Sequence, residues 1–119
     1  MEGDFMFFNK KEVRILMVDF VGFEKTVKVL SYAKGLANHS SDIIAKAIAG
    51  LDPRIEAAKT EKIKEFKNFG ILGKVGDEVI LLGNEAVMKE NNIELTGDTN
   101  HKVFFAIDNR VQAVFRLDE

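Results

Sequence analysis

The residues between Gly70 and Asn84 form the pattern in this chain with the most chemical meaning. Four glycines alternate there with apolar residues, and the stretch ends in a Gly83-Asn84 step before a predicted helix. Glycine lets a backbone approach a ligand closely, and the N-terminus of a helix favours negative charge. The pattern therefore fits two structures equally well: a segment that holds a nucleotide, or a hairpin followed by a well-capped helix.

Few other side chains form a pattern that could catalyse a reaction. No nucleophile–base pair and no pair of carboxylates stands at a telling spacing. The absence of cysteine excludes disulfides and thiolate chemistry, and His39 and His101 lack the spacing of metal ligands. We therefore expect no catalytic centre and no metal site in this chain.

The composition is that of one globular domain. A chain of 119 residues fits a single domain, residues 1–119, that needs neither metal nor disulfide to fold. A net charge of -2 argues against a nucleic-acid binder, and the lysines of residues 59–74 alternate with glutamates, as on a solvated surface. No apolar run approaches the ~20 residues that span a bilayer, and the N-terminus lacks a basic signal region. We expect a soluble chain that does not insert into a membrane.

The first half of the chain predicts two strands and then two helices. The strands cover residues 5–8 and 13–20, which are rich in β-branched and aromatic residues, with a polar turn at residues 9–11. Two apolar stripes at helical spacing follow: Phe23, Val27, Leu30, Ala33 and Leu36, then Ile43, Ile44, Ala47, Ile48 and Leu51. Ser40 or Ser41 caps the second helix, and Pro53 marks its end. We expect a helical hairpin.

The second half predicts strands around one short helix. Residues 62–69, 71–75 and 78–82 are predicted strands, although the three-residue recurrence of apolar side chains in the first of them fits no regular template. A helix over residues 84–90 and a hairpin of residues 103–107 and 111–117 follow. Because hairpin connections dominate, we expect an α+β fold, with a mostly antiparallel twisted sheet of about six strands flanked by helical hairpins.

Five segments spread over nearly the whole chain match the motifs of a known family. They are Glu2-Gly3-Asp4-Phe5, residues 40–48, residues 66–75, Leu82-Gly83-Asn84 with Met88 and residues 91–93, and residues 105–108 with Leu117-Asp118. In order, they resemble the sequence after a DKTGTLT motif, SEHPLAKAI, FKxxxGxGVxGKV, VGNxxxMxxNGI, and VAIDG with the segment that returns to the phosphorylation domain. The chain thus resembles the nucleotide-binding domain of heavy-metal-transporting P-type ATPases, the copper and zinc pumps.

This resemblance implies a function in ATP binding. In the family, the domain is inserted into a haloacid-dehalogenase-like phosphorylation domain, holds adenine, and presents the γ-phosphate of MgATP to a catalytic aspartate. The implied ligands are ATP and ADP, and the implied partners are the phosphorylation and actuator domains on the cytosolic face of a membrane transporter. DKTGT is absent from this sequence, so we expect a monomeric domain that does not hydrolyse ATP alone.

The resemblance also implies a set of nucleotide-binding residues: Asp42, Asn68, Gly70, Gly83 and Asn84, with His39 and Lys46 as further candidates. Each has a second interpretation from the residues alone. Asp42 accepts a hydrogen bond from adenine or complements the first turn of a helix; Gly70 admits adenine or relieves a bend in a strand. Asn84 binds the nucleotide, caps a helix, or does both.

Three positions depart from the family pattern. The family's histidine aligns with Asp42, its adenine-facing glutamate with Ala37, and the first glycine of its GxG with Asn68. These departures favour an alternative function, in which a domain of the same fold has lost nucleotide binding and serves as a structural or regulatory interaction module.

Overall fold

The computed structural model describes residues 13–67 and 69–118. The predicted strand of residues 5–8, its turn at residues 9–11 and the candidate Asn68 therefore lie outside the described residues. Nine helices and strands follow one another in this part of the chain: β1 (Arg14–Phe20), α2 (Thr26–Ala37), α3 (Ile43–Ala49), β2 (Glu61–Glu65), β3 (Gly70–Val75), β4 (Glu78–Gly83), α4 (Glu85–Glu90), β5 (Lys102–Ile107) and β6 (Arg110–Asp118).

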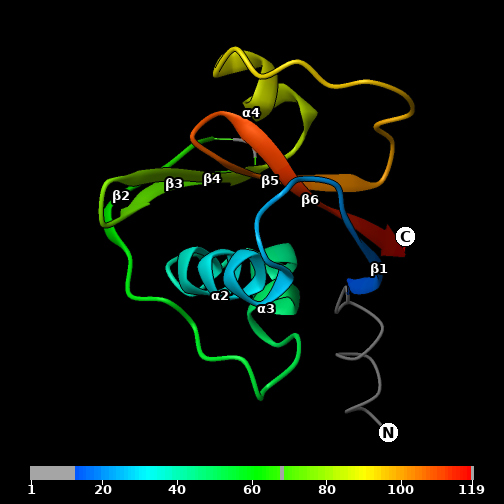
Figure 1. The fold of residues 1–119 in the computed structure, drawn as a ribbon. Helices are drawn as coiled ribbons and strands as arrows, with labels where there is room; N and C mark the ends of the chain where they lie inside the picture. Colours follow the sequence, from blue (N-terminus) through cyan, green and yellow to red (C-terminus); the bar gives the residue numbers. More distant parts are fainter. Residues whose placement is uncertain (1–12, 68, 119) are drawn as a thin grey trace, which may run out of the picture.

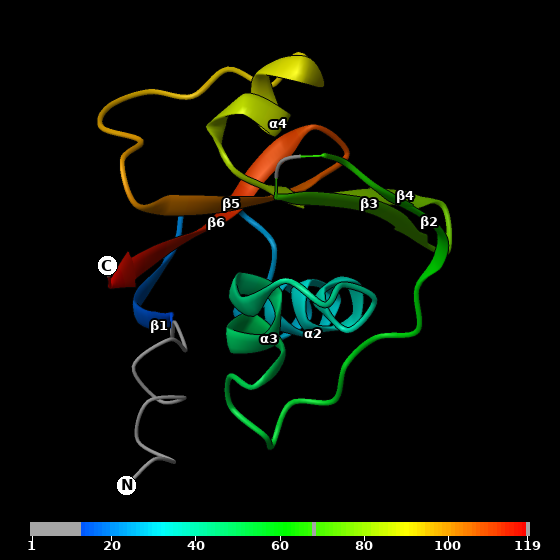
Figure 2. The same ribbon diagram turned by 180° about the vertical axis from the view of Figure 1, so that it is seen from behind.

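The six strands form one open sheet in the order β1-β6-β5-β4-β3-β2, and each neighbouring pair is antiparallel. Helices α2 and α3 pack on one face of the sheet and α4 on the other (Figures 1 and 2). The predicted α+β fold with a mostly antiparallel sheet of about six strands is confirmed. Among the described residues α2 and α3 form a single helical hairpin, and α4 is a short helix by itself.

The sheet has an apolar core on each of its two faces. In β5, Val103, Phe105 and Ile107 join the cluster under α2 and α3, whereas Phe104 and Ala106 join the cluster under α4. Alternate side chains of a strand point to opposite faces, so a strand covered on both faces reads as a continuous apolar run. This is why residues 103–107 are all buried.

Helix α2 begins later than its apolar stripe predicts. Phe23 lies in the loop before the helix, fully exposed at 104%, and Val27 in the first turn is also exposed. Gln112 of β6 holds this loop: its carbonyl oxygen accepts from Val21 N at 3.0 Å and its Oε1 accepts from Glu24 N at 3.2 Å. The predicted core position of Phe23 is therefore wrong, because hydrogen bonds to β6 keep the segment out of the helix.

Strand β2 is shorter than predicted and irregular. Lys62 has a left-handed φ of 56°, and the register with β3 shifts between Glu61 and Lys64. After Glu65 the chain turns, and Phe66 N donates to Gly70 O at 2.9 Å. The strand predicted for residues 62–69 thus ends at residue 65, and this bulge and turn explain the unusual recurrence of its apolar residues.

The first and last described strands lie side by side. Arg14 pairs with Asp118 across β1 and β6, and their side chains form an ion pair of 2.6 Å. None of the described helices is long and apolar enough to span a membrane; α2, with 12 residues, is the longest.

Candidate functional site

A small cleft opens where the α2–α3 loop faces the connection from β2 to β3. Its volume is about 180 Å³, and the described residues that line it are Ser40, Ser41, Asp42, Glu65, Phe66, Lys67, Phe69 and Gly70. These residues come from two segments that are more than twenty residues apart in the sequence. Two of the predicted site residues, Asp42 and Gly70, line this cleft together.

Asp42 forms one wall of the cleft at the start of α3. Its Oδ1 accepts from Ile44 N at 2.8 Å, and Ser40 Oγ accepts from the Asp42 backbone N at 3.1 Å. Asp42 is therefore the helix cap, and the predicted cap at Ser40 or Ser41 is wrong. Its second oxygen accepts no hydrogen bond from any residue that the structure describes. That oxygen is available to accept a hydrogen bond from a ligand.

Two aromatic side chains stand on the opposite side of the cleft. Phe66 packs toward the α4 cluster and Phe69 toward the α2–α3 cluster, so the two side chains contact opposite faces of the sheet. The ammonium of Lys64 lies 5.3 Å from the ring centroid of Phe66. Both phenylalanines fall within the strand predicted for residues 62–69, and their irregular spacing is the signal of this turn in the sequence.

The charges lining the cleft are Asp42, Glu65 and Lys67, which leave one excess negative charge among the described residues. The hydroxyls of Ser40 and Ser41 add groups that can donate or accept hydrogen bonds. This lining suits a ligand group with hydrogen-bond donors better than it suits a phosphate.

Gly70 and Gly83 share a packing role behind the cleft. They are direct partners across β3 and β4, and Val87 of α4 sits above them. A Cβ on Gly70 would lie 2.5 Å from Val87 Cγ2, and a Cβ on Gly83 would lie 2.7 Å from Val87 Cγ1. The two glycines therefore let α4 pack closely on the sheet, while the backbone of Gly70 also lines the cleft.

Asn84 lies behind the cleft without lining it. Its side-chain oxygen accepts from Val87 N at 3.0 Å, which makes it the cap of α4. Its backbone N donates to Phe69 O at 3.2 Å and so supports a residue of the cleft. The capping interpretation is confirmed, and a contact with nucleotide stays a prediction.

The remaining candidates stand apart from the lining. His39 is exposed in the α2–α3 loop, and Lys46 is exposed on α3, one turn beyond Asp42. Ala37, aligned with the family's adenine-facing glutamate, is 1% exposed and belongs to the core. A side chain at position 37 faces the core, so it does not reach a ligand in the cleft.

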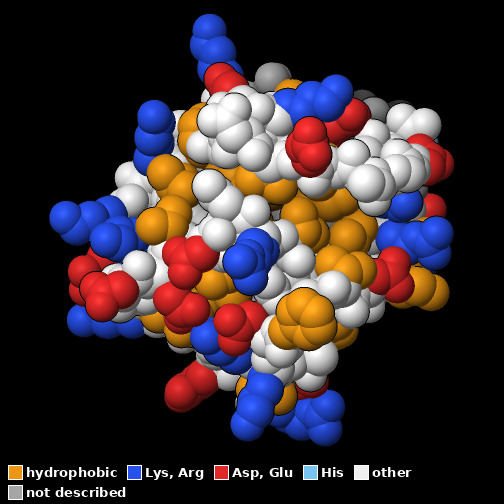
Figure 3. Space-filling view, turned by 45° about the horizontal axis from the view of Figure 1, so that its top comes forward, with side chains coloured by type: hydrophobic (Ala, Val, Ile, Leu, Met, Phe, Trp, Pro, Cys, Tyr) orange, Lys and Arg blue, Asp and Glu red, His pale blue; other side chains and the backbone are white. Residues whose placement is uncertain are grey.

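A wider hollow of about 1060 Å³ opens elsewhere, between the loop after α4 and the β5–β6 turn. Its lining includes Lys89, Ile93, Leu95 and Arg110, and none of the predicted site residues. In a view that brings the α4 side forward, hydrophobic side chains gather in separate groups between charged ones (Figure 3). This hollow is the main competitor of the cleft as a ligand site.

No model of a protein family matches this sequence, and no curated protein matches it significantly. Solved structures do. The N-domain of HMA6, a copper-transporting P-type ATPase, superposes with a TM-score of 0.71 and 21% identity, covering 91% of this chain and 100% of that domain. The catalytic domain of the CPx-ATPase CopB-B follows with a TM-score of 0.68 and 19% identity, covering 90% of this chain and 37% of that domain.

A zinc-transporting PIB-type ATPase in the E2P state contains a similar domain, with a TM-score of 0.66 and 16% identity; the match covers 90% of this chain and 19% of that protein. The chain therefore has the fold of the N-domains of copper- and zinc-transporting P-type ATPases. It spans a whole isolated N-domain, and a minor part of the larger ATPase chains that contain one.

Proposed function

We propose that this chain binds ATP as the nucleotide-binding domain of a heavy-metal-transporting P-type ATPase. The observation that carries the proposal is the cleft, where the Asp42 segment and the Gly70 segment meet. Each segment resembles a different motif of the family, and the fold brings them together at one hollow. A fold shared with N-domains of copper and zinc pumps supports the same function.

The size of the cleft favours binding of the base alone. At about 180 Å³ the cleft is smaller than the ~300 Å³ at which pockets for whole drug-sized ligands begin. We infer that adenine enters the cleft, and that the ribose and phosphates extend outside. Phe66 and Phe69 are half-buried residues of the lining. Stacking of a base on either ring would contribute about 1–3 kcal/mol, as in nucleic-acid complexes.

Asp42 fits this orientation of the nucleotide. Its Oδ2 can accept a hydrogen bond from the exocyclic amino group of adenine, while Oδ1 caps α3. A carboxylate in this place would repel phosphates, so the phosphates must point away from it. In this arrangement the domain contributes by positioning MgATP, and the phosphoryl transfer takes place on another domain.

Strands β1 and β6 lie side by side, and Arg14 pairs with Asp118 across them. We propose the phosphorylation and actuator domains of such an ATPase as partners, and the cytosolic side of the membrane as the location.

The affinities for ATP, ADP and AMP, measured by isothermal titration calorimetry, test this proposal. We expect dissociation constants within about tenfold of each other, because the shared adenosine makes most of the contacts. In Asp42→Asn the amide oxygen keeps the cap and the amide nitrogen replaces the acceptor, so affinity should fall about fivefold while stability is retained. Absence of binding at millimolar nucleotide would contradict the proposal, and binding of ATP alone would contradict the placement of adenine in the cleft.

A second candidate function is an interaction module of the same fold without nucleotide binding. The burial of Ala37 and the carboxylate at position 42 favour it, since two family positions lack their usual polar groups. In this case all three nucleotides would give no heat of binding, and Asp42→Asn would be indistinguishable from the natural sequence.

A further inference from the structure

One face of α2 carries a polar strip formed by Ser31, Lys34 and Gly35. These residues are spaced by three and four positions and therefore lie together on the helix. The strip contacts the connection of residues 50–60 that leads from α3 to β2. That connection runs below the helices, away from the sheet, before it rises to β2 (Figures 1 and 2).

Lys34 is the centre of the strip. It is only 5% exposed, and its ammonium donates to the backbone carbonyls of Leu51, Asp52 and Ile55 at 2.5, 2.7 and 2.8 Å. An ammonium has three hydrogens to donate, so every one of them has a backbone partner. The carboxylate of Asp52 pairs with Arg54 at 2.9 Å. Burying a charge is costly, and this full set of partners fixes the connection tightly to α2.

The other two residues extend the contact toward β2. Ser31 Oγ donates to Glu56 O at 2.7 Å, and Ser31 O accepts from Ala58 N at 2.9 Å. Thr60 Oγ1 donates to Gly35 O at 3.3 Å. A Cβ on Gly35 would lie 2.1 Å from Ala58 O, so only glycine allows this approach. The connection is thus bound to α2 along most of its length.

The segment held by this strip joins the two walls of the cleft. Its first residues follow α3, whose N-terminal end carries Asp42, and its last residues enter β2, whose C-terminal end carries Glu65 and leads to Phe66. Helix α3 has only seven residues, and β2 is an edge strand with a bulge, so neither wall is fixed by its own element alone.

We propose that Lys34 is a positioning residue that fixes the two walls of the cleft relative to each other. Its three carbonyl contacts determine the position of the chain between the end of α3 and the start of β2. They therefore determine the width of the cleft. The role in ligand binding rests on the proposed function, whereas the fixing of the walls does not.

Hydrogen exchange of the full chain, without ligand, tests the fixing of the walls. Lys34→Met keeps the length of the side chain and removes the ammonium. We expect at least tenfold faster exchange at the amides of Ile44 and Phe66, one in each wall, as well as in residues 51–58. Faster exchange confined to residues 51–58 would overturn the proposal. If Lys34→Met does not fold, Ser31→Ala removes one contact of the same strip and should give the same pattern more weakly.

Nucleotide affinity provides the second readout. Lys34→Met should weaken AMP binding at least fivefold, whereas Phe115→Leu, which lowers stability in the core beneath β6, should leave it unchanged. Unchanged affinity in Lys34→Met would overturn the positioning role. Absence of binding by the natural sequence would refute the proposed function instead, and the exchange experiment would still decide the role of Lys34 in fixing the walls.

Chemical rescue distinguishes the effect of losing the ammonium from the effect of disturbing the core. The chain has no cysteine, so Lys34→Cys introduces a unique thiol. Alkylation of the unfolded variant with 2-bromoethylamine, followed by refolding, restores an ammonium on a chain of nearly lysine length. We expect exchange rates and affinity to return to within twofold of the natural values. The same treatment of Lys25→Cys, at an exposed position, should change neither; failure of rescue at position 34 would overturn the proposal.

Discussion

Gly70 and Gly83 lie opposite each other on β3 and β4, and Val87 of α4 fills the space above them. At the scale of single residues, these glycines therefore have a packing role that does not depend on any ligand. The glycine-rich stretch that first indicated a nucleotide site therefore serves in large part to let α4 pack on the sheet. Only the backbone of Gly70 also reaches the cleft.

Gly70→Ala should destabilise the domain. The added Cβ would meet Val87 at 2.5 Å, and overpacking of this kind typically costs about 1–3 kcal/mol. Removing the obstacle with Val87→Ala should make the glycine substitution much less harmful in the double variant than in the natural background. Urea unfolding of the four proteins measures this coupling.

Gly50→Ala is the matched control for this substitution. Gly50 caps α3 with an ordinary helical φ, and a Cβ there would meet its nearest atom at 3.5 Å. We expect a change within about 0.5 kcal/mol. Equal destabilisation at positions 50 and 70, or absence of coupling with Val87, would contradict the packing role.

The sequence predicted some of the residues that line the cleft and missed others for a physical reason. Asp42 and Gly70 were predictable, because each lies in a motif-like segment with a clear local role. The location of Phe66 and Phe69 at the cleft was not predictable, because it depends on where β2 ends. The hydrogen bond between Phe66 and Gly70 and the bulge at Lys62 determine that end. Ala37 could be aligned, but its orientation toward the core follows only from the packing of α2.

At the scale of elements, α4 is tied to the long loop that follows it. Thr99 Oγ1 donates to Glu85 Oε1 at 2.7 Å, and Lys89 pairs with the other oxygen of Glu85 at 3.1 Å. The hydrogen bond from Thr99, and then the one from Lys89, lower the pKa of Glu85 below its ordinary value of 4.5. Ionised Glu85 therefore links the helix to the loop.

This link should make the stability of the domain depend on pH in the acidic range. The folded pKa of Glu85 lies below the unfolded one, so its contribution is fully present above about pH 4.5 and is lost as the pH falls through the folded value. Glu85→Gln should therefore lower the thermal midpoint at pH 7, and its difference from the natural sequence should shrink as the pH falls below 4.5. Thermal unfolding followed by circular dichroism across the acidic range measures the difference.

Thr99→Val provides the control for the cause of the shift. Loss of the hydroxyl removes the first contributor to the lowered pKa, so part of the pH dependence should disappear while Lys89 still pairs with Glu85. A pH profile of Thr99→Val identical to that of the natural sequence would contradict the assigned cause.

Most elements were predictable from local patterns, and the exceptions have causes outside the element. Strands β3 to β6 and helices α2 to α4 lie close to the ranges that periodicity and turn residues predict. The start of α2 differs from its predicted position because Gln112, far away in the sequence, forms hydrogen bonds with the preceding loop. The end of β2 differed because its register shifts beside β3.

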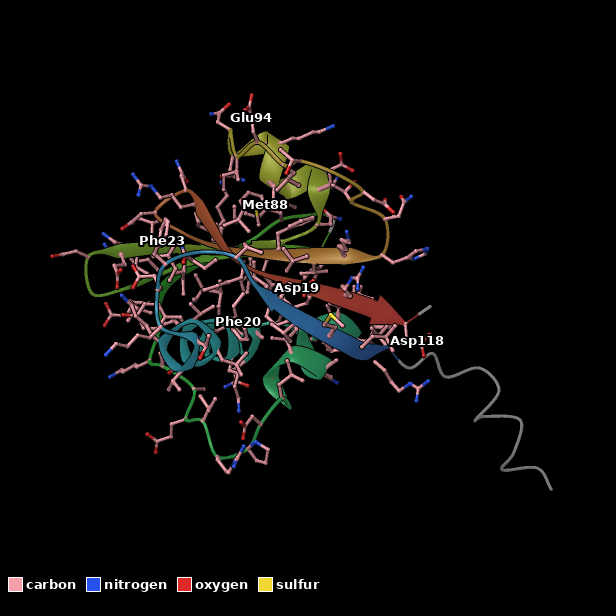
Figure 4. All side chains as sticks on the ribbon, turned by 45° about the vertical axis from the view of Figure 1, so that its right-hand side comes forward. Asp19, Phe20, Phe23, Met88, Glu94 and Asp118 are labelled. Atoms are coloured by element: carbon pink, nitrogen blue, oxygen red, sulfur yellow. The ribbon has the colours of Figure 1, made fainter. Side chains whose placement is uncertain are left out.

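At the scale of the whole molecule, one aromatic side chain contributes little to the fold. Phe23 projects from the loop between β1 and α2 and is fully exposed, in contrast to Met88 of α4, which is buried in the cluster between this helix and the sheet (Figure 4). Phe23→Ser should therefore change the free energy of unfolding by less than about 0.5 kcal/mol, whereas Met88→Ala should cost about 2–5 kcal/mol. Similar losses in the two variants, measured by urea unfolding, would contradict this arrangement.

The architecture of the molecule was predictable because a family resemblance and the order of elements agreed. Six strands with hairpin connections leave few ways to cover both faces, and the pair of helices and the single helix occupy one face each. The volume of the cleft and the buried contacts of Lys34 could not be predicted, because they arise only where three elements meet.

The most direct test of the central claim is a map of amide chemical shifts during titration with AMP and ATP. We predict that both nucleotides shift the amides of residues 40–42 and 65–70 in a saturable manner, with the phosphates of ATP adding small changes outside the cleft. Shifts centred on residues 92–95 and 109–111 would place the ligand in the wider hollow instead. That result, or the absence of any shift at millimolar nucleotide, would contradict the account.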